Sequence, residues 1–262
     1  MTRDYSKFGV LMESHRYAEA VAEARKMLPA AADDLGPIQC LAEALLALGD
    51  YRAALPLYER IDAAERADKR VAGRSGRRNF MACIHWMLGD NARGIELLGQ
   101  LVDGILDGSI EFGDVAGGVQ QGLLLHYMGV TAGDQSAKTK ALKYLRTRAK
   151  RMAIKAFPGP VARYYLGEID FAAVLVAATE RLSPQRAGTS DLAAAMELAR
   201  DDLLTRRFMC VALFHDGVKA RAGGDEAHCM MRMRECLGLE NPLIELEWYL
   251  ARFEVEKERS RV

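Results

Sequence analysis

The sequence predicts an all-α protein of stacked helix–turn–helix units, arranged as a right-handed α-solenoid. Three observations predict this fold. Apolar residues recur at steps of three and four, the first 68 residues align with themselves at a shift of 34, and no segment alternates apolar and polar residues as a β-strand would. Because one amphipathic hairpin cannot cover its own apolar face, such units stack on one another.

The 34-residue shift superimposes chemically similar residues. Tyr17 falls on Tyr51, and Ala20 falls on Ala54. In the second copy, AEALLALGDYRAALPLYERI, the Gly-Asp pair at 49–50 breaks the chain between two helices. Ala54 is small, so it lets the second helix of the unit lie close to the first.

A third unit is predicted at 80–101. Its break is the Gly-Asp pair at 89–90, and Gly94 takes the small-residue position. This break lies 40 residues after the previous one instead of 34 because the chain gains a basic, glycine-containing insertion at 68–78.

The rest of the chain is predicted to be helical but less regular. A last unit is expected at 210–239, with its break at Gly223-Gly224-Asp225. A final helix from Pro242 to about Lys257 is expected to pack on it and to close the stack with a charged tail. The prediction is one domain, 1–262, with regular repeats in 1–106, irregular central helices in 107–190, and a C-terminal repeat with its capping helix in 191–262. Further helices are expected near 93–106, 113–131, 136–156, 160–167, 170–182, 191–201 and 203–222.

The repeat length, the Gly-Asp breaks and the small residue at Ala54 make the first three units resemble the tetratricopeptide repeat. The segment FPGPVARYYLGEI, 157–169, also resembles a region of NlpI-like bacterial repeat proteins, although their lipoprotein cysteine has no counterpart here. The first resemblance implies a scaffold that binds proteins and catalyses no reaction. It also implies that the first helices of successive units line a concave binding face.

On that concave face the resemblance implies five candidate protein-binding residues: Tyr5, Gln39, Glu43, Trp86 and Phe214. Trp86 follows His85, which is expected to face the core, so Trp86 is expected to point into the groove as an anchor for a partner. The open alternative is that Trp86 packs beneath the basic 68–78 insertion.

The stretch GDVAGGVQQG, 113–122, has the glycine content of a phosphate-binding loop. However, no Lys or Arg occurs from 94 to 133, and six acids lie between 94 and 134, which disfavours a polyphosphate. We expect Asp114 to cap a helix whose early turns hold Gly117, Gly118 and Gly122, with the glycines permitting close helix packing. A partner-contacting surface and nucleotide binding are the alternatives.

Charge is segregated along the chain. The segment 135–167 holds nine basic residues and no acid, most of them on the helix expected at 136–156. One interpretation is that these side chains cover the outside and pair with the preceding acidic span. A second is a docking patch for an acidic protein surface, and a third is nucleic-acid binding assisted by Tyr144 and Tyr164. The candidate binding residues on this helix are Lys143, Arg146, Lys150 and Arg151.

The block 97–130, taken with KYLRTRAKR at 143–151 and PGPVARYYLG at 158–167, resembles bacterial helical-repeat proteins encoded beside secreted toxins. Those proteins act as immunity proteins, for example in type VI secretion systems. The resemblance implies tight binding to one toxin domain, and charge segregation suits such binding because it speeds encounter and selects partners.

No catalytic, metal or cofactor motif is found. The five histidines lack the spacing of a catalytic or zinc site, and His228, Cys229 and Cys236 match no usual zinc pattern. The five scattered cysteines favour reduced thiols. With 36 basic and 36 acidic residues and no long apolar run, the sequence predicts a cytoplasmic, non-enzymatic protein with no metal, cofactor or membrane partner.

The leading hypothesis is therefore an immunity protein that binds a cognate bacterial toxin. The alternatives are a general repeat adaptor or chaperone, and an RNA-binding regulator that uses the helix at 136–156. The balanced net charge opposes strong non-specific binding to nucleic acid. A homo-oligomer remains an open possibility.

Overall fold

The computed structural model describes residues 5–28, 34–67, 76–110, 117–150, 156–180, 188–243 and 245–260. Within these ranges the chain forms fourteen α-helices and no β-strand, so the all-α prediction is confirmed. None of the helices in these ranges has both the length and the apolar character needed to cross a membrane.

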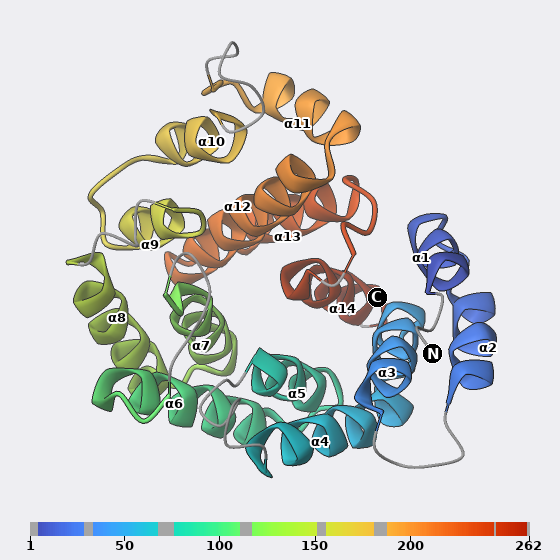
Figure 1. Ribbon diagram of the computed structural model, residues 1–262. Coiled ribbons are helices and arrows are strands. Elements are labelled where there is room, and N and C mark those ends of the chain that lie inside the picture. The colour runs from blue at the N-terminus through green and yellow to red at the C-terminus, as the bar shows by residue number, and fades with distance from the viewer. Residues whose placement is uncertain are drawn as a thin grey trace.

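The first eight helices follow the chain as successive neighbours, each packing on the next (Figure 1). The remaining six continue around the molecule and return to its interior. The first group is α1 (Ser6–Glu13), α2 (Tyr17–Met27), α3 (Leu35–Leu48), α4 (Tyr51–Ala67), α5 (Gly76–Met87), α6 (Asn91–Asp107), α7 (Val119–Ala132) and α8 (Gln135–Ala149). The second group is α9 (Gly159–Tyr165), α10 (Phe171–Thr179), α11 (Leu192–Asp201), α12 (Leu203–Ala222), α13 (Glu226–Leu237) and α14 (Leu246–Arg259).

Four hairpin turns share one local design. In each, a glycine with a left-handed backbone ends one helix, and the aspartate after it accepts a hydrogen bond from a backbone N–H in the first turn of the next. The sequence analysis identified the turns at 49–50, 89–90 and 224–225, and the structure adds 133–134 between α7 and α8. The central region is therefore more regular than predicted.

Small residues set the spacing between the paired helices. A methyl group on Gly94 would lie 2.9 Å from the carbonyl oxygen of Ala82, and one on Gly122 would lie 2.6 Å from Cδ1 of Tyr144. Both distances are too short for a side chain, so these glycines are required by close packing. The predicted small-residue role of Gly94 is confirmed, and so is the packing role of Gly122.

The helix over the glycine-rich stretch begins later than predicted. Gly118 is the residue before α7, and both Gly117 and Gly118 have positive φ, at 61° and 86°. They shape the turn that enters the helix, instead of lying in its early turns. Asp114, the predicted cap, lies outside the described residues.

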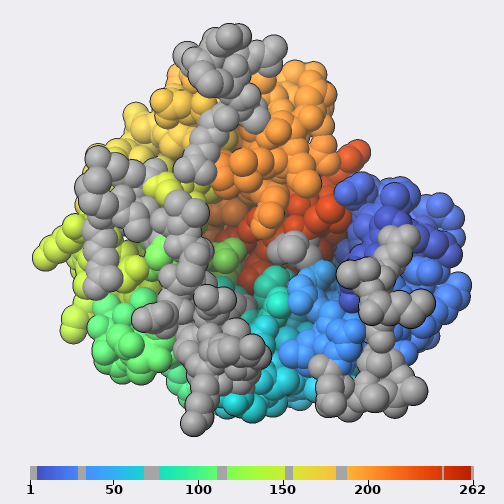
Figure 2. Space-filling view, in the orientation of Figure 1, coloured from blue at the N-terminus to red at the C-terminus, as the bar shows by residue number. Residues whose placement is uncertain are grey.

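The C-terminal helix occupies the interior of the molecule (Figure 1). α14 packs on α5, α12 and α13, and α12 also packs on α7. Arg252 of α14 donates to the backbone carbonyls of Ala47 and Leu46 at the end of α3, at 3.0 and 3.4 Å. The predicted packing of the final helix on the last unit is therefore confirmed, and the structure adds contacts of α14 with α5 and with the end of α3. In Figure 2, α14 (red) is largely enclosed by its neighbours.

Candidate functional site

The outer face of α8 carries an unpartnered basic stripe. Asp134 caps this helix, and Ala141, Tyr144 and Leu145 bury its opposite side. Lys143, Arg146 and Lys150 are exposed, and their spacing of three and four residues places them on one face. Within the described part of the chain, none of the three has an ion pair. α8 lies at the outer edge of the molecule, in yellow-green (Figure 2).

The neighbouring acidic span neutralises only part of this helix. Lys140 pairs with Asp103 of α6, with Nζ 2.7 Å from Oδ2, and both side chains are well exposed. The interpretation in which the basic residues pair with the preceding acids therefore holds for Lys140. It does not hold for the stripe.

One basic residue of α8 turns inward. Arg148 is buried, and its guanidinium donates to the carbonyl oxygen of Gly117. The expectation that the basic side chains cover the outer faces is wrong at this position, because the turn before α7 offers Arg148 a backbone acceptor. Arg151 lies outside the described residues.

A hollow of about 500 Å³ adjoins the stripe. Its apolar element is Leu106 of α6, which is 43% exposed. Polar side chains surround it, among them Lys143 and the ion pair of Lys140 with Asp103, so the hollow offers apolar contact inside a polar rim. We call Leu106, Lys140, Lys143, Arg146 and Lys150 together the α8 surface. The hollow is lined by Asp103, Leu106, Gln135, Ser136, Thr139, Lys140 and Lys143.

Trp86 and Phe214 lie in the core, which corrects their assignment to a concave binding face. Trp86 is 1% exposed, and its indole N–H donates to the Tyr127 hydroxyl at 2.9 Å. The ring of Phe214 packs edge-on against the same tyrosine. His85 is the more exposed of the two neighbours, with a side chain that is 16% exposed and Nδ1 3.3 Å from Asp90. Neighbouring residues on a helix point about 100° apart. Of these two neighbours, Trp86 and not His85 is therefore the one that faces the core.

Gln39, Glu43 and Tyr5 contact other parts of the same chain. Gln39 donates to Glu43 at 2.8 Å and accepts from Arg77 at 2.8 Å. Burial raises the pKa of Glu43, although the hydrogen bond from Gln39 opposes the shift. Tyr5 is partly exposed, and its hydroxyl lies beside Gly36. The structure thus brings Gln39 and Glu43 together with Arg77, a partner that the sequence analysis did not identify.

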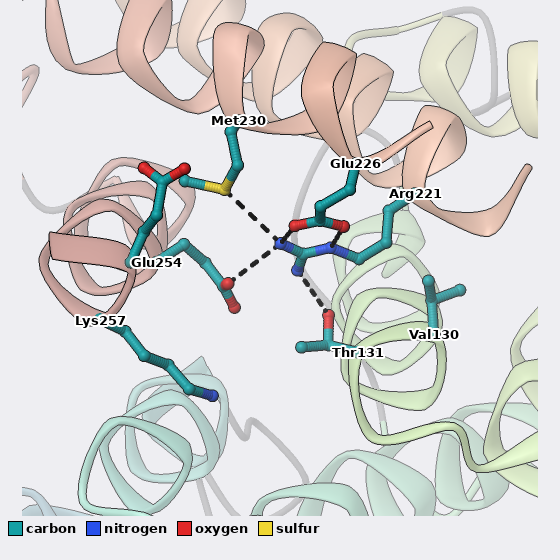
Figure 3. Close-up of a pocket in the computed structure, with 8 residues that line it drawn as sticks. Val130, Thr131, Arg221, Glu226, Met230, Glu254 and Lys257 are labelled. Carbon is teal, nitrogen blue, oxygen red and sulfur yellow. Dashed lines mark hydrogen bonds and ion pairs between the residues drawn. The ribbon is translucent and has the colours of Figure 1, made fainter. Parts of the chain in front are cut away.

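A hydrogen-bonded network fixes α14 inside the molecule (Figure 3). Arg221, at the end of α12, donates to Glu226 at 2.9 and 2.7 Å, to Glu254 of α14 at 3.1 Å, and to Thr131 of α7 at 3.1 Å. Glu254 also accepts from the Tyr127 hydroxyl at 2.7 Å. Burial lowers the pKa of Arg221, but the two carboxylates outweigh burial and raise it overall.

These contacts surround a pocket of about 410 Å³. The Arg221 side chain is only 12% exposed there. Since its donors are directed at Glu226, Glu254 and Thr131, the guanidinium has little capacity left for an outside anion. The network therefore holds α7, α12, α13 and α14 together, and sequence spacing gave no signal for it.

A second buried network lies at the start of α14. His215 contacts Tyr165 through Nδ1 at 2.9 Å and Glu247 through Nε2 at 3.3 Å. Arg207 donates to Glu245 at 2.8 Å, and Gln120 donates to Glu247 at 3.0 Å. Because His215 and Glu247 are completely buried, this network fastens α14 to α7, α9 and α12.

Burial controls ionisation in this second network. It lowers the pKa of His215 to about 3, so the imidazole is neutral near pH 7. Burial and the neighbouring Glu247 carboxylate raise the pKa of Glu245 to about 8, although Arg207 opposes the shift. Glu245 therefore holds its proton to a higher pH than an exposed glutamate does.

The histidine and cysteine of the segment 228–236, whose spacing matches no usual zinc pattern, contact other residues. His228 lies 2.9 Å from Asp216, and Cys236 lies 2.8 Å from Cys210. Among the described residues, no group of three or more His, Cys, Asp or Glu side chains is arranged to hold a metal ion.

Together, the fold and these sites define a set of closely packed helices whose interior is occupied by α14 and whose helix α8 carries a basic stripe on its outer face. Comparison with protein-family models, with curated proteins and with solved structures finds no match. The resemblance to tetratricopeptide and immunity proteins therefore rests on the residues quoted above and remains a prediction.

Proposed function

We propose that this chain is a non-catalytic protein-binding scaffold whose α8 surface docks on an acidic patch of another protein. The observation that carries the proposal is the stripe of Lys143, Arg146 and Lys150, exposed on one face and without an ion pair in the described structure. The buried guanidinium of Arg221 is paired with carboxylates of the same chain, whereas the stripe presents positive charge to solvent. Such a patch attracts a partner of opposite charge and fixes its orientation.

The finer architecture that we propose is a tetratricopeptide-like right-handed α-solenoid whose concave side is filled by its own C-terminal helices. The repeated glycine–aspartate turns and the close packing at Gly94 support it. Because α14 covers the inner faces of α5 and its neighbours, we place the binding face on the outside of the stack. This differs from the concave-face binding that the family resemblance implies.

We further propose that the partner is a cognate toxin domain, which this chain neutralises as an immunity protein in the bacterial cytoplasm. The resemblance of the block 97–130 and of the α8 sequence to such proteins supports this assignment. A basic surface suits an acidic toxin face because opposite charges accelerate association, and fast association matters when a toxin must be captured before it acts.

Co-expression with the product of the neighbouring gene tests the proposal. We expect that product to be toxic alone, to be neutralised by this chain, and to co-purify with it. The triple variant K143E/R146E/K150E is expected to lose at least tenfold in affinity. A matched control is R25E/R52E/R259E, which makes the same charge change at exposed residues of other helices and is expected to bind normally.

Each alternative has its own outcome. A neighbouring product that is harmless alone contradicts the immunity assignment, and capture of many unrelated proteins supports a general adaptor or chaperone. Salt-sensitive RNA binding that the triple variant loses would support the nucleic-acid alternative. The structure weakens that alternative, because Tyr144 is fully buried and Tyr164 lies beneath the Lys219 ammonium, so neither ring is free to stack on a base.

A further inference from the structure

The seam between α12 and α13 has one consistent antiparallel register. Arg206 pairs with Glu240 at one end, Asp216 pairs with Arg232 in the middle, and Arg221 pairs with Glu226 at the other end. In this register Cys210 of α12 lies opposite Cys236 of α13. The same register places Gly217 opposite Cys229, two helical turns along the seam.

The two helices approach closely along this seam. A methyl group on Gly217 would lie 3.0 Å from the carbonyl oxygen of Cys229, so the backbones are held near each other by the lack of a side chain. At the other position, the sulfur atoms of Cys210 and Cys236 lie 2.8 Å apart. The Cys236 sulfur also lies 3.6 Å from the carbonyl oxygen of Cys210, so it points at the backbone of α12. Two sulfur atoms that face each other this closely need little movement to bond.

We propose that Cys210 and Cys236 form a site of reversible disulfide modification that joins α12 covalently to α13. The proposal is independent of the α8 surface. It also departs from the expectation, drawn from scattered spacing, that all five cysteines are reduced thiols.

The position of Cys236 gives an oxidant a route to the pair. Both sulfurs are buried, but Cys236 is the penultimate residue of α13, and the last turn of a helix opens most easily. In the first step the Cys236 thiolate attacks a low-molecular-weight disulfide such as oxidised glutathione. This step forms a mixed disulfide and releases one thiol. Cys210 then loses its proton and attacks the Cys236 sulfur, which forms the intrachain bond and releases the second thiol.

The test uses the folded, full-length protein and oxidised glutathione. After incubation, free thiols are blocked with N-ethylmaleimide, first in native buffer and then in denaturant, and the intact and digested protein are weighed. We expect a product 2 Da lighter than the reduced chain before blocking, a cross-linked peptide containing Cys210 and Cys236, and N-ethylmaleimide on Cys40, Cys83 and Cys229. The bond closes a span of 26 residues, so the melting temperature is expected to rise by several degrees.

Two serine variants serve as controls. C210S is expected to abolish the cross-link, whereas C229S, on the same helix as Cys236, is expected to leave it intact. Refolding from urea in a glutathione redox buffer gives a second route to the bond if the native pair reacts slowly. The proposal is overturned if both cysteines carry N-ethylmaleimide after both treatments, or if Cys236 stops at the glutathione adduct.

Discussion

Charged side chains have opposite environments in the interior around α14 and on the outer face of α8. In the interior, Arg221 contacts two carboxylates and a hydroxyl, and Glu254 contacts both Arg221 and Tyr127. On α8, Lys143 and Arg146 face solvent with no carboxylate opposite them in the described structure. The interior charges hold the chain together, and the outer charges are available to another molecule.

The difference also supports the proposal that a partner binds outside, on α8, and not in an inner groove. A concave face lined by first helices is the surface on which a repeat protein normally binds its partner. Here the chain supplies its own occupant, since Glu254 of α14 reaches Tyr127 of α7, and Arg252 reaches the end of α3. Changing interior residues should therefore alter stability, and changing α8 should alter binding.

The largest expected effect comes from Trp86→Ala. Removing this buried indole leaves a cavity between α5 and α7 and takes away the N–H that donates to the Tyr127 hydroxyl, which keeps its hydrogen bond to Glu254. We expect a loss of about 3–5 kcal/mol in the free energy of unfolding. Urea denaturation measures it. The neighbouring change, His85→Ala, is expected to cost about 1 kcal/mol or less. Equal losses would contradict the assignment of Trp86 to the core.

The second largest loss in the free energy of unfolding, about 3 kcal/mol, is expected from Arg221→Met. It leaves the buried Glu254 carboxylate without its cationic partner, which is among the more costly single changes in a protein interior. The same substitution on the outer face, Arg146→Met, is expected to change stability by no more than about 0.5 kcal/mol. Both changes are measured by urea denaturation. If Arg146→Met lowered the free energy of unfolding as much as Arg221→Met, the interior and the outer face of α8 would not differ as described.

Glu245 makes the interior sensitive to pH. Its pKa is about 8 in the folded protein, where burial and Glu247 raise it, so the folded state retains a proton that the unfolded state has already lost. This contribution to stability is complete at pH below about 4.5 and is lost as pH rises toward 8, with a slope of up to about 1.4 kcal/mol per pH unit. Denaturation midpoints of wild type and Glu245→Gln, compared from pH 5 to 8, should diverge. Parallel curves would show that Glu245 ionises normally.

Two buried histidines should make the stability of the fold depend on pH in the opposite direction. Burial lowers the pKa of His215 to about 3 and that of His126 to about 4. Their contribution is present above about pH 6.5 and is lost as pH falls toward 4, because the unfolded state then binds the proton more strongly. Wild type should therefore lose stability on both sides of a maximum, and Glu245→Gln should remove only the alkaline loss.

The smallest effect on stability is expected from the α8 triple variant. K143E/R146E/K150E and the control R25E/R52E/R259E replace exposed side chains, so each single change should stay within about 0.5 kcal/mol. Their melting temperatures should agree closely, and only the α8 variant should bind the partner weakly. A much lower melting temperature for the α8 variant would show that the stripe has a structural role.

Local features of the fold were predictable because they depend on neighbours in the sequence. The Gly-Asp pairs mark turns through left-handed glycine and aspartate capping, and the small residue at Gly94 follows from the repeat. The helices expected at 191–201 and 203–222 match α11 and α12 to within a residue. The hairpin at 133–134 uses the same signal, which was present in the sequence but was not recognised as a unit break.

Contacts between residues far apart in the sequence could not be predicted in this way. The sequence predicted that the final helix packs on the last unit, but it did not predict the additional contacts with α3, α5 and α7. The partners of Glu254 and Arg252 in these contacts lie far away in the sequence. Arg148 belongs to a basic run, so sequence alone placed it outside, and its backbone acceptor at Gly117 lies 31 residues away. Of the candidate binding residues, Lys143, Arg146 and Lys150 are exposed as expected, whereas Trp86 and Phe214 are buried.

Amide hydrogen exchange, followed by mass spectrometry with and without the partner, tests the central claim most directly. We predict that peptides from α14 exchange as slowly as those from α5 and α7 in the free protein, and that binding slows exchange on α8 alone. Fast exchange of α14 in the free protein, with protection of α14 or α5 on binding, would mean that the inner face is open and binds the partner. That result would contradict the account.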